Sequence, residues 1–150
     1  MKLTKQQNLR NLWLTIIQYA CLFLFLILSP LTASGIWWQG IEFSGFILGV
    51  WSIFVMSKSK LNITPQPKHG DILVESGPYK VIRHPMYSAI IITFTPLIIT
   101  HFDYFRLAII IVLYLNLIFK LLFEESLLKE FFKPYKVYMK STWRLIPFIF

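Results

Sequence analysis

The chain has 150 residues, of which 56% are hydrophobic and only 15% are charged. A chain of this length with so much apolar surface does not fit an ordinary soluble domain. The net charge of +8 would suit a nucleic-acid-binding protein, but the basic residues flank apolar runs instead of forming one face of a soluble fold. Composition therefore predicts an integral membrane protein and argues against nucleic acid as a partner.

Four apolar runs follow one another along the chain, at residues 12–31, 36–56, 87–100 and 105–122. A helix needs about 20 apolar residues to cross the hydrocarbon layer. The first run is too long for a signal peptide and lacks a small-residue cleavage pattern, so we expect a membrane helix there. The third run is short, contains Pro96, and is extended if its helix begins at Pro85. The pattern predicts an all-α, polytopic membrane protein with about four transmembrane helices, the last two forming a helical hairpin.

Lysine and arginine indicate the orientation. They gather before the first run, between the second and third, and after the fourth, whereas connectors 32–35 and 101–105 contain none. Cytoplasmic connectors retain basic residues during insertion. We therefore expect a multi-pass protein of the cell membrane, or of an endomembrane in a eukaryote, with both termini in the cytoplasm.

Two small features concern packing rather than chemistry. Gly45 and Gly49 form a small-xxx-small pair, which lets another helix approach closely, either within the chain or in a second copy. The oligomeric state therefore stays open. Cys21 is the single cysteine and lies inside an apolar run, so neither a disulfide framework nor a metal site is predicted.

Polar residues that can carry chemistry occur in the connector 71–87 and again at Glu124-Glu125. The predicted hairpin returns both groups to the same membrane face, where they can share a site. His84 precedes the helix-starting Pro85, and free N–H groups at a helix start can accept an anionic group such as a carboxylate.

Each acidic residue also has a plain structural alternative. Glu125 can form a surface ion pair with Lys129, and Glu124 can pair with Lys120 one helical turn earlier. The basic tail, taken alone, favours an amphipathic segment lying on an anionic membrane surface.

Taken together, these motifs resemble the isoprenylcysteine carboxyl methyltransferase family and its relatives among the phospholipid methyltransferases. The resemblance covers about the last 80 residues, in order, and the first two helices match only as generic spans. It is carried by Ser76-Gly77-Pro78-Tyr79, Arg83-His84-Pro85-Met86-Tyr87, Glu124-Glu125 with Leu128, Tyr135-x-x-Tyr138 and Arg144-x-x-Pro147.

The resemblance implies methyl transfer from S-adenosylmethionine to a lipophilic acceptor: an isoprenylcysteine-like carboxylate, a phospholipid amine or a small lipophile. It implies one domain, 1–150, with the cofactor portion at about 71–147. By position, Lys120 would lie near the acceptor. No catalytic residue is assigned, because Pro134 stands where relatives usually have an acidic residue. The residues implied to bind the cofactor are Leu73, Val74, Tyr79, His84, Pro85, Tyr87 and Glu124.

Two other functions remain open from the sequence. Some membrane reductases that use NADPH have similar C-terminal segments, and a non-enzymatic membrane assembly subunit would also suit the basic tail and the glycine pair. A soluble Rossmann-type methyltransferase is excluded, because the six glycines show no GxG pattern.

Overall fold

A computed structural model describes residues 4–58 and 73–150, without the side chains of Lys58 and Phe131. Residues 71 and 72, at the start of the predicted cofactor portion, lie outside the described residues. The elements are helical: α1 (Lys5–Leu28), α2 (Ile36–Lys58), the short 3-10 helix η1 (Gly77–Lys80), α3 (Pro85–Thr100), α4 (Tyr104–Phe131) and α5 (Tyr135–Ser141).

Three of these helices are long and apolar enough to span a membrane, over Lys5–Leu28, Ile36–Ser57 and Tyr104–Glu130. The helix of the third run begins at Pro85 and has 16 residues. At about 1.5 Å per residue it is roughly 24 Å long, shorter than a hydrocarbon layer of about 30 Å. The predicted all-α, polytopic membrane fold is confirmed, with α3 as a shorter apolar helix beside three full-length ones.

Local sequence explains where the long helices begin. Thr4 and Gln7 form a capping box at the start of α1, each side chain bonding the backbone of the other. At the start of α4, the Asp103 carboxylate accepts hydrogen bonds from the backbone N–H groups of Phe105 and Arg106, both at 3.0 Å. These caps satisfy N–H groups that have no partner inside the helix.

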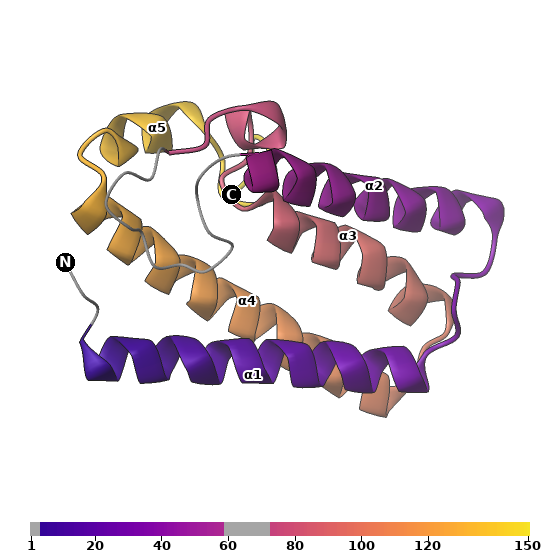
Figure 1. The fold of residues 1–150 in the computed structure, drawn as a ribbon. Helices are drawn as coiled ribbons and strands as arrows, with labels where there is room; N and C mark the ends of the chain where they lie inside the picture. The colour runs from indigo at the N-terminus through magenta and orange to yellow at the C-terminus, as the bar shows by residue number, and fades with distance from the viewer. Residues whose placement is uncertain (1–3, 59–72) are drawn as a thin grey trace.

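The apolar helices form two pairs, α1 with α4 and α2 with α3 (Figure 1). The two helices of the predicted hairpin are joined by residues 101–103, yet they diverge from this connector, and α3 packs mainly on α2. At the other end of the bundle, η1, the start of α3, the end of α4 and α5 come together. This is where the polar connector and the tail meet.

The glycine pair of α2 faces α3. A Cβ atom added to Gly45 would lie 2.6 Å from Oγ1 and 2.7 Å from the backbone N of Thr93, and one added to Gly49 would lie 3.4 Å from Cβ of Ala89. The predicted small-residue contact is confirmed, and its partner is a helix of the same chain.

The outer surfaces of the helices are strongly apolar. Phe23 and Ile27 on α1, and Trp51 and Phe54 on α2, are all more than half exposed. Monomers in water rarely expose so much contiguous apolar surface, whereas lipid chains cover it without cost. The buried core lies inward, around Leu113, Leu117 and Leu121 of α4 with Phe25 of α1.

Candidate functional site

The segment before α3 is paired with the C-terminal tail through the backbone. The N–H of Arg83 donates to the carbonyl of Trp143 at 2.7 Å, and the N–H of His84 donates to the carbonyl of Arg144 at 3.1 Å. In return, the N–H of Trp143 donates to the carbonyl of Val81 at 2.9 Å. This parallel pairing holds the side chains at the start of α3 against the tail.

Arg83 and Glu125 form a buried ion pair. Nε of Arg83 lies 2.8 Å from Oε1 of Glu125, and the two side chains are only 7% and 1% exposed. Nε of Arg144 lies 3.2 Å from the other carboxylate oxygen. The surface pairing with Lys129 considered from the sequence is therefore wrong, because the Glu125 carboxylate points into the protein and meets two arginines there.

The same arginine fixes the short helix of the tail. Nη1 of Arg83 donates to the carbonyl of Met139 at 3.0 Å and to the carbonyl of Thr142, at the C-terminal end of α5. Carbonyl groups at a helix end lack intrahelical donors, so a cation there is stabilising. Both tyrosines of α5, Tyr135 and Tyr138, are buried. The tail is thus folded against the site, and the expectation from composition alone, a segment that only lies on the membrane surface, is wrong for α5.

Glu124 meets residues from the start of α3. The hydroxyl of Tyr87 donates to Oε1 of Glu124 at 2.7 Å. The rings of Tyr87 and His84 are stacked, with centroids 5.5 Å apart and planes at 2°. Nδ1 of His84 lies 3.8 Å from Oε2 of Glu124, which is too long for a hydrogen bond. The motif before α3 and the acidic pair of α4 therefore form one cluster, as the sequence predicted.

Lys120 reaches this cluster from one helical turn earlier on α4. Its Nζ lies 6.0 Å from the centroid of the Tyr87 ring and donates a hydrogen bond of 2.8 Å to Oε1 of Gln18 on α1. Among the described residues it forms no salt bridge with Glu124, so that structural alternative is wrong. Gln18 was missed by the sequence reasoning, since a lone amide in an apolar run gives no indication of its partner.

Three buried polar atoms near the two glutamates have no hydrogen-bond partner within the described part of the chain: the hydroxyls of Tyr79 and Tyr135, and Nε2 of His84. Buried polar groups in folded proteins are nearly always hydrogen-bonded. Atoms left without a partner in a polar cluster are suited to meet a ligand.

The tyrosines around the cluster are held in the neutral form. Burial raises the pKa of Tyr79 well above its usual value, and the negative charge of Glu124 raises it further. Burial and then the charge of Glu125 do the same for the pKa of Tyr135. Both hydroxyls therefore keep their protons at neutral pH and can donate a hydrogen bond.

The remaining residues expected at the site lie beside the cluster. Pro85 is buried at the first position of α3, where its missing N–H costs no hydrogen bond. Leu73 is half-buried and Val74 is buried, and both precede η1 on the connector.

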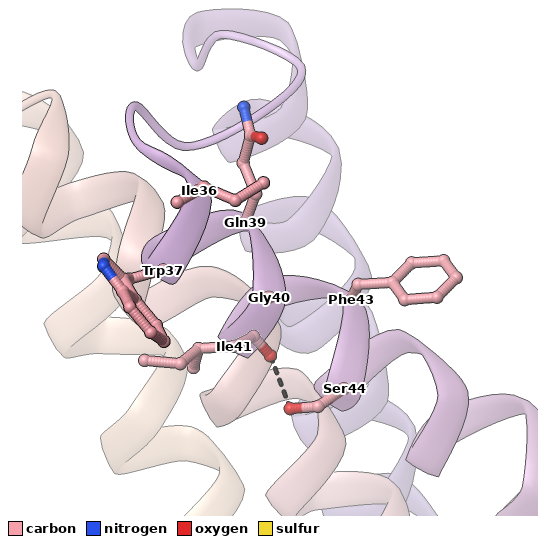
Figure 2. A pocket seen from close by; sticks show the side chains of 7 residues that line it. All are labelled: Ile36, Trp37, Gln39, Gly40, Ile41, Phe43 and Ser44. Carbon is pink, nitrogen blue, oxygen red and sulfur yellow. Dashed lines mark hydrogen bonds between the residues drawn. The ribbon is translucent and has the colours of Figure 1, made fainter.

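A different, open hollow lies at the first turns of α2, at the opposite end of the bundle (Figure 2). Its two polar side chains are satisfied by backbone carbonyls: Gln39 donates to Ala33 at 3.1 Å, and Ser44 donates to Ile41 at 2.7 Å. Figure 2 shows Trp37, Gln39 and Phe43 pointing in different directions around the helix. Without convergent polar groups, this hollow is no candidate for the chemistry. It is lined by Ile36, Trp37, Gln39, Gly40, Ile41, Phe43 and Ser44.

Comparison with known proteins gives a match over the part of the chain that contains most of the cluster. The sequence model of the phospholipid methyltransferase family matches residues 40–134, well over half the length. The match includes most of α2, and η1, α3 and α4 with both glutamates. No curated protein and no solved structure matches the chain. The family resemblance inferred from the motifs is confirmed.

Proposed function

Because the chain belongs to the phospholipid methyltransferase family, we propose that it transfers a methyl group from S-adenosylmethionine to a lipophilic acceptor. The observation that carries the proposal is the buried cluster of His84, Tyr87, Glu124 and Lys120, with unpartnered polar atoms around it. The cluster lies at the end of apolar helices, where a lipid-soluble acceptor and a water-soluble cofactor can both arrive.

The residues of the cluster fit the charges of this cofactor. S-adenosylmethionine carries a sulfonium, an ammonium and a carboxylate. Glu124 supplies a carboxylate for the positive groups, and the hydroxyl of Tyr87 orients that carboxylate. The free hydroxyls of Tyr79 and Tyr135 are donors for the negative one.

We assign the cofactor to the residues expected from the motifs and place the acceptor beside Lys120. The chain then acts as one domain, 1–150, with the cofactor portion at about 71–147. The residues proposed to hold the cofactor are Leu73, Val74, Tyr79, His84, Pro85, Tyr87 and Glu124.

The cofactor supplies an activated methyl group: the acceptor's nucleophilic atom bonds to the methyl carbon as the carbon–sulfur bond breaks, and sulfur keeps the electron pair. The protein's share is alignment and exclusion of water. Tyr87 fixes the Glu124 carboxylate through its 2.7 Å hydrogen bond, and the Arg83–Glu125 pair holds α3, α4 and the tail together around it.

The site is proposed to open to the cytoplasm. Arg83 before α3 and Arg144 in the tail lie at the cluster. Connector 101–105, at the far end, contains no lysine or arginine, and the next arginine, Arg106, is paired with Asp103 at 3.9 Å. By the distribution of lysine and arginine, both termini then face the cytoplasm.

The direct test is calorimetric binding of S-adenosylhomocysteine to the purified chain in detergent. We expect a dissociation constant on the order of micromolar, weakened at least about tenfold by Glu124→Gln, which removes the negative charge, and by His84→Ala, which removes the imidazole ring. Glu130→Gln is the matched control, because it removes the same charge from an exposed position of the same helix.

A folded wild-type protein that does not bind S-adenosylhomocysteine would contradict the proposal. Titration of the same sample with NADPH then separates the remaining alternatives. A membrane reductase binds NADPH, and an assembly subunit binds neither ligand.

A further inference from the structure

A buried polar contact joins α1 to α4 inside the apolar part of the bundle. Gln18 and Lys120 are only 7% and 8% exposed, and the Lys120 Nζ donates to the Gln18 amide oxygen at 2.8 Å. Both residues lie within helices that are apolar enough to span a membrane. An ionisable side chain in such a place is costly to bury and marks a functional position.

The amide holds the lysine without neutralising it. Gln18 offers a neutral oxygen to one of three N–H donors of the ammonium group. Glu124, the nearest acid along α4, accepts the hydroxyl of Tyr87 instead, and no carboxylate among the described residues forms a salt bridge with Lys120. The positive charge therefore stays available to a ligand.

A second contact, with the ring of Tyr87, shows where the Lys120 side chain points. Its Nζ lies 6.0 Å from the centre of the Tyr87 ring, whose hydroxyl reaches Glu124. A lysine has a long, flexible stem and would otherwise turn toward Glu124 or extend toward water. The bond from α1 keeps the ammonium beside the cluster but apart from its carboxylates.

We propose that Gln18 is a positioning residue that holds the Lys120 ammonium, free of any salt bridge to a described carboxylate, for the anionic headgroup of a lipophilic acceptor. The headgroup is a phosphate or a carboxylate, because either can accept charge-assisted hydrogen bonds from the free donors. The acceptor role of this anion rests on the proposed function. Gln18 lies outside the segment matched by the family, so α1 adds this element to the site.

A second polar contact between the same helices supplies a matched control. Nδ2 of the buried Asn116 donates to the carbonyl of Leu14 at 2.9 Å, one turn before Lys120 on α4. Asn116→Leu therefore removes a helix-joining hydrogen bond while leaving the Gln18–Lys120 contact in place.

The experiment measures the binding of three amphiphiles of equal chain length, tetradecyl phosphate, myristate and tetradecanol, to the full chain in non-ionic detergent. Tryptophan fluorescence reports binding. We expect the wild type to bind the better anionic probe about tenfold more tightly than the alcohol. Gln18→Glu, which neutralises the ammonium, and Gln18→Leu, which releases it, should bring this ratio close to one. Asn116→Leu should keep it.

Stronger binding of the phosphate identifies a phospholipid-like acceptor, and stronger binding of myristate identifies a carboxylate-bearing one. Gln18→Glu conserves size and polarity, so it serves as the test even if Gln18→Leu does not fold. A wild-type ratio in Gln18→Glu, or an equal loss of the ratio in Asn116→Leu, would overturn the proposal and leave Gln18 a purely structural residue.

Calorimetry of S-adenosylhomocysteine on the same samples separates this proposal from the proposed function. If the cofactor analogue binds and the Gln18 variants keep the wild-type ratio, only the positioning role fails. If the analogue does not bind the wild type and the ratio still depends on Gln18, the methyltransferase proposal fails and the anion site stands.

Discussion

The two helix pairs are held together by different chemistry. Between α2 and α3, the missing side chain of Gly45 lets the backbone of Thr93 approach within 2.7 Å of where a Cβ would stand. Between α1 and α4, the contacts include two buried polar side chains, Asn116 and Lys120, bonded to the facing helix. A close contact of small residues is a good way to join helices in lipid, where no hydrophobic effect drives them together.

This difference suggests that the α2–α3 contact serves the stability of the fold, whereas the α1–α4 contact also bears on the candidate site. No buried side-chain polar atom of the described α2 and α3 helices lacks a hydrogen-bond partner, whereas the α1–α4 contact places the Lys120 ammonium beside the candidate site. The pairs are joined at the site end by the Arg83–Glu125 ion pair and by the Tyr87–Glu124 hydrogen bond. The geometry of the site therefore depends on how firmly one pair is fixed to the other.

Breaking the Arg83–Glu125 ion pair, which joins the two helix pairs, should lower the stability of the protein most. Arg83→Met leaves the Glu125 carboxylate buried with Arg144 as its remaining arginine, and should lower the free energy of unfolding by about 3–5 kcal/mol. Arg106→Met is the control, since its pairing with the exposed Asp103 at 3.9 Å should contribute no more than about 1 kcal/mol. Thermal and denaturant unfolding in detergent measure both. Similar losses in the two variants would show that the buried Arg83–Glu125 pair stabilises the protein no more than an exposed ion pair does.

Substitution in the close α2–α3 contact should have the next largest effect on stability. Gly45→Ala places a Cβ against the Thr93 backbone, so the two helices must move apart, and we expect a loss of about 1–3 kcal/mol. Gly40→Ala, on the same helix with open space around it, should leave stability unchanged or slightly higher. Equal midpoints of unfolding for these variants would contradict the close contact of α2 and α3.

The polar contact of the other pair should matter less for stability. Asn116→Leu removes one hydrogen bond to the Leu14 carbonyl and should cost about 0.6 kcal/mol, the typical value for such bonds between membrane helices. The same unfolding assay measures it. A loss as large as that of Gly45→Ala would mean that polar bonds, and not only packing, hold α1 to α4.

The smallest effect on stability is expected at Gly49, one helical turn after Gly45. A Cβ at position 49 would lie 3.4 Å from Cβ of Ala89, an ordinary packing distance, so Gly49→Ala should change the free energy of unfolding by less than about 0.5 kcal/mol. A clear destabilisation would show that the tight approach of the helices extends beyond Gly45.

Much of the fold was predictable because the relevant signals are local. Runs of apolar residues and the caps at their ends depend on neighbours in the chain, and they located the helices to within a few residues, except that α1 begins earlier and α4 ends later than predicted, in polar sequence. The motif around His84 and the pair Glu124-Glu125 pointed to a shared site and to the family for the same reason.

Only the tertiary structure decided which helices pair and which partner each buried charge has. Glu125, which the sequence allowed on the surface, is buried and paired with two arginines. Gln18 accepts a hydrogen bond from a lysine 102 positions away. No local pattern encodes such contacts, because they depend on the angles at which whole helices cross. The sequence by itself thus determined the membrane class, the helices and the motif, while long-range packing decided which of its charges are joined and which is left available.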